Sequence, residues 1–547
     1  MASIRYMFLR VTRQKLASGK TIAHYQLAES VWDREKRQSR VNILYNFGRA
    51  DNAKAVEELR KLARSIIRLT SPDDIPADHP DWTVVDATEY GGIHVLEQLW
   101  SKLGIDKIIR TQAEPLKLAF DLERAVFAME ANRVLAPASK LYCFEQCLQE
   151  DIYIEGASSL SLYHLYRAMD VLLAHKDAIE EKIYFQVTDL LNLDVDLIFY
   201  DTTSLHFETD KEDITLRKRG HSKNGRSDAP QIVVGMAVTR DGLPVRHWIF
   251  PGNTVDVTTV QQVKEDLCGW RLGRCLFVGD AGMVSAENLR SLALGGGRYI
   301  TSMPARHGGE VAREVLARPG RYHAVADNML VKEVTIGDGE RRRRYVVCHN
   351  PDEESRQRKH REQVIQELKA ELASLKQEGN HSKRTCQLIA KQRYSRYLRQ
   401  TKTGKLRINQ AAIREAEKLD GRFVVHSNDD TLSAEDMALG YKQLMRVEQA
   451  WRTLKSSLRV RPVHHWTEHR IRAHIFISVL SLLLVRVAER ACGDTWRNIH
   501  NDIKRIKLVQ LSGPHGMVWQ TTAPRKEALN RLKNMEISKP QTIIKTG

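Results

Sequence analysis

The feature that most constrains the fold is a series of short apolar runs between residues 195 and 302. Each run has strand length, and helical patterns separate the later ones. In chain order the predicted elements are strands at Val195–Tyr200, Gln231–Val238 and Val245–Phe250, a helix at Thr258–Trp270, a strand at Cys275–Val278, a helix at Ser285–Leu294 and a strand near Tyr299–Ser302. The turn Arg240-Asp241-Gly242 joins the second and third strands. This order predicts a layered α/β domain.

The residues before this series divide into two regions. Residues 1–80 form a β-rich segment with strands at Ile4–Val11, His24–Trp32 and Arg40–Tyr45, and one helix beginning at Ala53. Residues 81–192 are helical. Within them, Asp121–Asn132 and Ala138–Leu148 flank Pro137 and form either a DNA-reading helix-turn-helix or ordinary helix packing.

The residues after Met303 interrupt the α/β pattern. A hairpin is expected at Val331–Ile336 and Arg343–Val347, followed by a charged helix over Glu353–Glu378 and a second, basic helix. The strand pattern resumes at Arg422–His426. We therefore expect an insertion at 304–420 within a catalytic domain of 193–303 and 421–490, with a C-terminal tail region at 491–547.

The charge of the chain indicates its kind of partner. Its 547 residues carry a formal net charge of +17, which favours a polyanion, with nucleic acid ahead of an anionic membrane. The most apolar stretch, Ile475–Val485, is about half the ~20 residues that a membrane-spanning helix needs, so we expect a buried core helix. Arginines interrupt the N-terminal segment where a signal peptide would be apolar, and seven irregularly spaced cysteines fit a reducing cytoplasm.

Two aspartates follow apolar runs where the chain is expected to leave a sheet. Asp201 precedes Thr202-Thr203-Ser204, and Asp280 precedes Ala281-Gly282, so both have small or polar neighbours. Ligand sites in α/β sheets lie at strand ends. Phosphoryl transfer uses two divalent cations ~4 Å apart, and carboxylate oxygens are the ligands that Mg²⁺ prefers. Either aspartate alone is best explained as a turn cap; together they indicate a metal site.

A third acidic residue, Glu448, lies on a predicted helix between Tyr441 and Lys455. Each spacing is seven residues, or two helical turns, so one helix is expected to present all three from one face. From Tyr441 to Ile475 the chain has eight cations and two acids, a net charge of +6. A solvated helix face usually balances its charges, so this segment is expected to bind a phosphate backbone.

These residues resemble a known signature. Tyr441, Glu448 and Lys455 are similar to the Tyr-Arg-Glu-Lys signature of a large group of bacterial insertion-sequence transposases of the Asp-Asp-Glu type. Phe199-Tyr200-Asp201, Val278-Gly279-Asp280 and the segment Arg459 to His465 extend the resemblance, which covers roughly residues 190–490. One position departs from it, because Leu444 stands where the signature has arginine. Arg446 points about 200° around the helix from that position and cannot simply replace it.

The resemblance implies a ribonuclease-H-like catalytic domain, makes residues 81–192 the candidate DNA-end-binding domain, and implies cut-and-paste DNA transposition. Asp201, Asp280 and Glu448 would be catalytic and would hold two Mg²⁺ ions, with Mn²⁺ able to replace them. Terminal inverted repeats and target DNA would be the partners, a homodimer the active complex, and the bacterial cytoplasm, at the nucleoid, the location. The expected DNA-binding residues are Tyr441, Lys455, Arg446, Arg452, Arg459, Arg461, Lys223 and Arg226.

Several alternatives stay open on the sequence alone. The basic loop Gly220–Arg226 either guides a DNA strand or is a surface loop. A ribonuclease-H-like nuclease without joining activity would use the same metal chemistry. A catalytically inactive DNA-binding descendant of a transposase is a third reading, which the intact acidic trio disfavours.

Overall fold

The computed structural model divides into two compact units, Met1–Thr83 with Ser512–Gly516, and the remainder of the chain. The structure describes residues 6–15, 21–33, 38–69, 82–191, 193, 195–221, 225–226, 228–270, 272, 275–303, 311–338, 342–377, 382–513 and 516–546.

The first unit contains the three strands that the alternating pattern predicts. They are β1 (Tyr6–Lys15), β2 (Thr21–Asp33) and β3 (Gln38–Arg49), and they form an antiparallel sheet in the order β1-β2-β3. Helix α1 (Ala53–Leu69) packs on β3, where Phe47 and Ala55 are buried.

A helical bundle forms one part of the second unit. Its elements are α2 (Gly91–Lys102), α3 (Ile105–Ala113), α4 (Leu122–Leu135), α5 (Lys140–Tyr142), a π-helix (Cys143–Asp151), α6 (Leu162–Ala174) and α7 (Lys176–Leu190). Helix α4 is buried on nearly all sides, against α6 and the C-terminal helix α16 (Glu468–Cys492). As the first helix of the candidate helix-turn-helix, α4 therefore packs in the core, and the second helix of the candidate falls on α5 and the π-helix.

Helix α16 is long and apolar enough to cross a membrane by length and composition. However, 89% of its most apolar window is buried inside the protein. Its apolar surface therefore packs against protein, as expected for the core helix predicted around Ile475–Val485.

A nine-stranded mixed sheet forms the centre of the second unit, in the order β10-β11-β12-β15-β9-β8-β5-β6-β7. Its strands are β5 (Leu197–His206), β6 (Gln231–Val238), β7 (Pro244–Pro251), β8 (Leu276–Gly279), β9 (Arg298–Met303), β10 (His323–Ala326), β11 (Met329–Ile336), β12 (Arg343–His349) and β15 (Arg422–Ser427). The pairs β5/β8 and β8/β9 are parallel, and the others are antiparallel.

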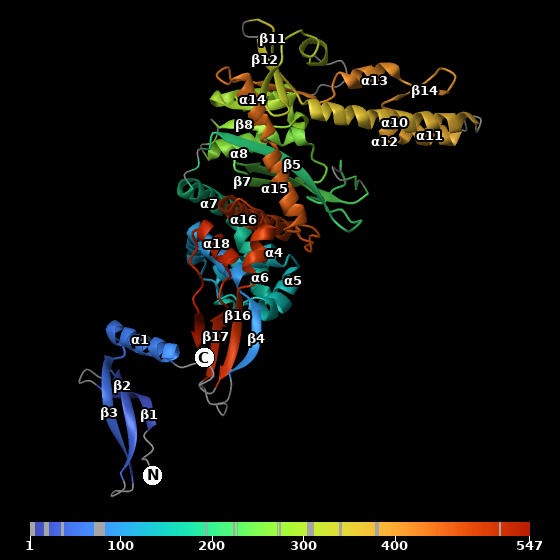
Figure 1. Ribbon diagram of the computed structural model, residues 1–547. Coiled ribbons are helices and arrows are strands. Elements are labelled where there is room, and N and C mark those ends of the chain that lie inside the picture. The colour runs from blue at the N-terminus through green and yellow to red at the C-terminus, as the bar shows by residue number, and fades with distance from the viewer. Residues whose placement is uncertain are drawn as a thin grey trace. The chain divides into compact units, whose positions relative to one another are not determined.

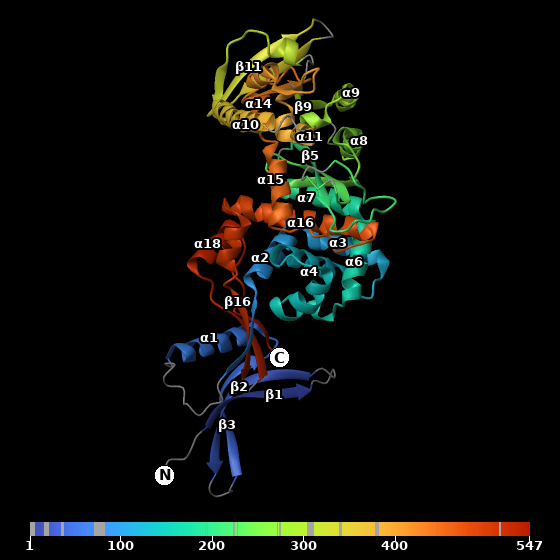
Figure 2. The same ribbon diagram turned by 90° about the vertical axis from the view of Figure 1, so that its right-hand side faces the viewer.

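Helices cover both faces of this sheet (Figures 1 and 2). Alternate residues of β5 point to opposite sides. Ile198 and Tyr200 share a core with helix α8 (Val260–Gly269), whereas Phe199 shares the main core with α15 (Met445–Ser456) and α16. Asp201 follows Phe199 by two residues and therefore lies on the α15 side.

The region expected to be an insertion contributes to the sheet as well as forming a structure of its own. Strands β10, β11 and β12 extend the sheet, while a separate small core lies among helices and a hairpin. These are α10 (Pro351–Gln377), α11 (Ser382–Ala390), α12 (Gln392–Ser395), β13 (Leu398–Gln400), β14 (Leu406–Ile408) and α13 (Gln410–Glu417). The hairpin β13–β14 had no counterpart among the predicted elements.

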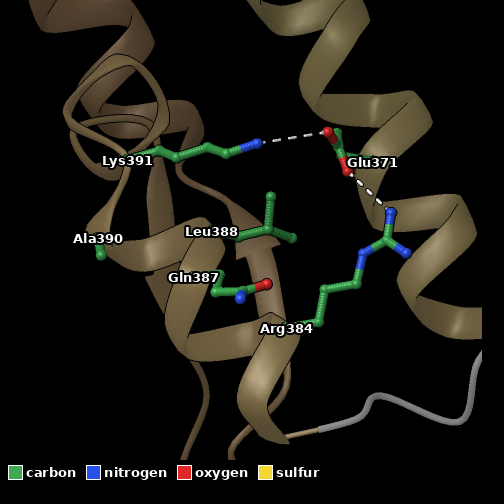
Figure 3. A pocket seen from close by; sticks show the side chains of 6 residues that line it. All are labelled: Glu371, Arg384, Gln387, Leu388, Ala390 and Lys391. Atoms are coloured by element: carbon green, nitrogen blue, oxygen red, sulfur yellow. Dashed lines mark hydrogen bonds and ion pairs between the residues drawn. The ribbon is translucent and has the colours of Figure 1, made fainter.

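A hollow of about 560 Å³ lies between α10 and α11 (Figure 3). Its acidic residue, Glu371, already pairs with Arg384 at 3.2 Å and with Lys391 at 3.7 Å. The hollow therefore presents paired charges, and none of the predicted site residues lines it.

The C-terminal region, expected only as a tail, is folded. It contains α17 (Trp496–Ile503), β16 (Lys507–Gly513), β17 (Gly516–Thr521), α18 (Lys526–Asn534) and β18 (Ile543–Thr546). With β4 (Thr83–Glu89) these strands form a four-stranded sheet in the order β18-β17-β16-β4.

Candidate active site

The register of two parallel strands brings Asp201 and Asp280 side by side. Phe199 of β5 pairs with Val278 of β8, so two residues further along each strand Asp201 lies opposite Asp280. Asp280 follows the last residue of β8 and keeps an extended backbone, with φ −83° and ψ 164°. Neighbouring strands are about 5 Å apart, and both side chains point to the α15 face.

The position of Asp201 corrects one expectation. It was predicted at the end of a strand, but β5 continues to His206, and Asp201 is the fifth of ten residues. The reason is that β6 pairs with β5 from Phe199 to His206, well beyond Asp201. The shorter β8 ends at Gly279, so Asp201 lies where the neighbouring strand stops.

Tyr441 and Lys455 contact this pair of strands from two different helices. The Tyr441 phenol donates a hydrogen bond of 3.0 Å to Asp280 Oδ1, and Lys455 Nζ donates one of 2.5 Å to Thr203 Oγ1. Thr203 is two residues beyond Asp201 on the same face of β5. The two outer residues of the signature are therefore anchored beside the two aspartates.

The single helix predicted through Tyr441, Glu448 and Lys455 is wrong. Helix α14 (Ala434–Lys442) ends after Tyr441, and α15 begins at Met445. In the junction, the amides of Leu444, Arg446 and Val447 bond to carbonyls three residues earlier, the tighter 3₁₀ pattern. The buried Leu444 side chain lies in the main core at this turn. A capping box of Ser433 and Asp436 begins α14.

Glu448 lies on the first turn of α15 and is exposed. Burial, and then the carboxylate of Asp280, raise the pKa of the Tyr441 phenol, and the charge of Glu448 adds to this effect. Glu448 is thus close enough to act electrostatically on a group that is hydrogen-bonded to Asp280. The phenol stays protonated at ordinary pH and remains a hydrogen-bond donor.

The described residues contain no group of three or more His, Cys, Asp or Glu side chains placed to hold a metal ion. Asp201, Asp280 and Glu448 therefore do not form a closed cluster, and the Tyr441 phenol occupies one oxygen of Asp280. The donor chemistry nevertheless fits a hard divalent cation, because two carboxylates lie in register on adjacent strands and a third is on the covering helix.

An acidic residue missed in the sequence, Asp256, lies close to the aspartate pair. Its Oδ1 accepts a hydrogen bond from Thr202, and a Cβ built on Gly282 would lie 3.7 Å from its Oδ2. Asn288 donates hydrogen bonds of 2.7 Å to the carbonyls of Val257 and Met283, joining the Asp256 turn to the Asp280 turn. Strands β5 and β7 run in the same direction, so their C-terminal ends lie on the same side of the sheet. The position of Asp256 soon after β7 was therefore a sequence signal that could have placed it near Asp201.

The basic residues predicted to bind DNA occupy different environments. Arg446 and Arg452 are exposed on α15, and Arg459 is exposed just beyond it with a positive φ of 43°. Arg461 donates a hydrogen bond of 2.7 Å to Nδ1 of His206, at the end of β5. Lys455 and Arg461 thus place two positive charges along β5, on the C-terminal side of Asp201.

The predicted basic loop is only partly described. Arg226 is exposed, but it pairs with Asp228 at 3.1 Å and with Glu208 at 3.7 Å. These acids neutralise the guanidinium within the protein. Lys223 lies outside the described residues.

The backbone just after α15 accepts hydrogen bonds from the side chains of Arg133 of α4 and His474 of α16. Arg133 donates a 3.0 Å hydrogen bond to the Arg459 carbonyl, and His474 Nε2 bonds to the Val460 carbonyl at 3.0 Å. Burial lowers the pKa of Arg133 to about 10, so the guanidinium stays charged at neutral pH. Sequence reasoning missed this pair, since only the fold brings residues 341 positions apart together.

Comparison with known proteins identifies the region that holds this site. The family model described as a transposase DDE domain matches residues 196–484, which is more than half of the chain. No match to a curated protein was found. A cryo-EM structure of piggyBac transposase in a synaptic complex with hairpin DNA is similar over 81% of this chain and 79% of that one, with 11% identity and a TM-score of 0.34. That score is too low to support an argument about function.

Proposed function

The chain belongs to the transposase DDE domain family and is a DNA transposase, and from this premise we propose that Asp201, Asp280 and Glu448 are its catalytic residues. The observation that carries the proposal is the parallel register of β5 and β8, in which Phe199 pairs with Val278 and each aspartate follows two residues later. Tyr441 and Lys455 contact the same two strands from the helices that flank Glu448. Tyr441 and Lys455 thus contact residues at least 161 positions earlier in the chain, at the end of β8 and in β5.

We propose a ribonuclease-H-like arrangement for residues 193–303 and 421–490. The support is the strand order β7-β6-β5-β8-β9, in which three antiparallel strands are followed by two parallel ones. Helices α8 and α9 (Ala286–Ala293) follow β7 and β8 in the chain. This is the order that the apolar runs predict. The strands β10–β12 and the helices α10–α13 enter this unit between β9 and β15.

Members of this family generally use divalent metal ions. We propose two Mg²⁺ ions, replaceable by Mn²⁺, with Asp201, Asp280 and Glu448 as ligands. When bound, such ions activate the attacking oxygen and stabilise the leaving oxygen. Tyr441 fixes the orientation of Asp280 through its hydrogen bond, and movement of the phenol would free Oδ1 as a second ligand atom.

The cationic residues beyond the carboxylates supply the DNA contacts of the proposal. Lys455 would hold the phosphate next to the scissile bond, because its ammonium lies over Thr203, two residues from Asp201. Arg461 lies further along β5 and would hold the same strand. A water would first cleave the phosphodiester at each element end, and the freed 3′ hydroxyl would then attack the target DNA.

The partners in this proposal are terminal inverted repeats and target DNA, bound by a homodimer, because two ends must be cut and joined together. We further propose that the protein belongs to a bacterial insertion-sequence group and acts in the cytoplasm at the nucleoid. The spacing of Tyr441, Glu448 and Lys455 supports the group, and the net charge of +17 supports the location at DNA.

The experiment supplies purified protein with a pre-cut duplex carrying the inverted repeat that flanks the gene, together with target plasmid and Mg²⁺. We expect covalent joining of the 3′ end to the plasmid, and loss of joining in Asp201→Asn with DNA binding retained. Cleavage of uncut repeats without joining would instead support the nuclease reading. Binding without either reaction would support the inactive DNA-binding reading.

A further inference from the structure

The two-stranded hairpin β13–β14 has an apolar side and a basic side. Leu398, Leu406 and Ile408 join the small core of the helical region, and β14 packs on α10. Because strand residues alternate in direction, Arg399 and Arg407 face the other way, and both are exposed. The apolar anchor therefore fixes which side of the hairpin the arginines occupy.

Arg399 and Arg407 are direct cross-strand partners in this hairpin. Like charges placed directly opposite each other destabilise an antiparallel pair. Each strand has only three residues, and a short two-stranded hairpin is marginally stable, so the repulsion between these arginines is a substantial cost to its stability. An anion bound to the outer side would remove the repulsion.

The turn of the hairpin adds two more cations. Lys402 and Lys405 are exposed on either side of Gly404, which has a φ of +79°. From His381 to Ile408 the sequence contains nine lysines and arginines and no aspartate or glutamate. The hairpin thus carries four exposed positive charges within ten residues.

The neighbouring helices differ from the hairpin in one respect. Three cations of α11, α12 and the turn between them are paired with acids of α10: Arg384 and Lys391 with Glu371 (Figure 3), and Arg393 with Glu367 at 2.9 Å. Across the parts of the chain that the structure describes, no acid pairs with the four hairpin cations Arg399, Lys402, Lys405 and Arg407. Acids of α10 thus compensate these three neighbouring cations, whereas the four hairpin cations have no such acid among the described residues and can bind an external anion.

We propose that the outer side of the β13–β14 hairpin binds the phosphate backbone of duplex DNA. A two-stranded ribbon fits the major groove, and guanidinium groups match phosphate oxygens bidentately. The contact is independent of base sequence, because arginines and lysines at phosphates carry no sequence information. This inference rests on the proposed function, for which the hairpin supplies a second DNA contact outside the carboxylate site.

The test measures binding of the full-length protein to a 40-base-pair duplex of arbitrary sequence by fluorescence anisotropy at a series of salt concentrations. Each lost phosphate contact lowers the salt slope by about 0.9. We expect Arg399→Gln/Arg407→Gln to lower the slope by about two contacts and Arg399→Lys/Arg407→Lys to retain it. Arg356→Gln/Arg358→Gln removes the same charge from exposed positions of α10 and should leave the slope close to that of the wild type.

The outcomes separate this inference from the proposed function. Equal slopes for the hairpin variant, the α10 control and the wild type, with unchanged melting temperatures, would overturn the hairpin role and leave the catalytic proposal standing. Tighter binding to single-stranded than to duplex DNA through the hairpin would also overturn it. A wild-type protein that binds no duplex would contradict both proposals.

Discussion

Tyr441 donates a hydrogen bond of 3.0 Å to Oδ1 of Asp280, and so connects the end of α14 to the end of β8. The bond joins residues that are 161 positions apart in the sequence, and it orients one carboxylate oxygen of a proposed metal ligand. It gives Tyr441 a role in positioning the site, in addition to the phosphate contact that the resemblance implies.

Tyr441→Phe should reduce the rate of DNA cleavage without unfolding the protein. A hydrogen bond to a charged group contributes about 1.5–3 kcal/mol, so we expect a loss of roughly 10- to 100-fold in kcat/KM. The pKa of the phenol is raised, so it stays protonated throughout the ordinary range of assay pH. The pH profile of the variant between 6 and 9 should therefore match that of the wild type. A profile that changes shape would indicate that Tyr441 transfers a proton.

Lys455→Ala should weaken DNA binding and reduce its dependence on salt. Its ammonium lies 2.5 Å from Thr203 Oγ1, beside the aspartates, and one lost phosphate contact lowers the salt slope by about 0.9. Binding measured from low to high salt would show this change. Lys369→Ala, at an exposed position of α10, is the matched control. An unaltered slope in Lys455→Ala would remove the phosphate role.

Leu444→Arg, which restores the arginine of the signature, should destabilise the protein. Leu444 is 8% exposed and lies in the main core at the junction of α14 and α15. Burying an unpaired guanidinium there should cost about 2–4 kcal/mol of unfolding free energy. Urea unfolding measures the loss, and Leu444→Met should cost less than about 1.5 kcal/mol. Full stability of the arginine variant would mean that its side chain escapes to solvent.

Glu180 should contribute a pH-dependent part of the stability. Burial alone would raise its pKa, but the ammonium of Lys176 and the imidazole of His247 lower it to about 2. The folded pKa is below the unfolded one, so this stability is fully present above pH ~4.5 and is lost as the pH falls towards 2. Glu180→Gln should flatten the decline of unfolding free energy between pH 5 and 2. The idea fails if the wild type and the variant decline in parallel.

The sequence predicted most of the central sheet, because its strands are short apolar runs bounded by turns. It also indicated both aspartates, since Asp201 and Asp280 follow such runs. The break between α14 and α15 was missed, because every residue there keeps a helical backbone and only the burial of Leu444 and the 3₁₀ bonds reveal the turn.

Other features depend on contacts between distant segments and leave little local signal. The strands β16, β17 and β18 were missed because β4, with which they share a sheet, lies some 420 positions earlier in the chain. Asp256 and Arg133 were missed for a similar reason. Each is an ordinary polar residue in sequence and gains its role only where Thr202 or the Arg459 carbonyl meets it.

The measurement that tests the account most directly is the metal dependence of cleavage by Asp201→Cys. A thiolate binds Mg²⁺ poorly but accepts softer divalent ions, so a ligand exchanged for cysteine changes the metal preference of the enzyme. We predict at least ~10³-fold slower cleavage than wild type in Mg²⁺, substantial recovery in Mn²⁺, and unchanged affinity for the duplex. Wild-type cleavage by this variant in Mg²⁺, or an equal loss in both metals with the fold intact, would contradict the assignment of Asp201 as a metal ligand.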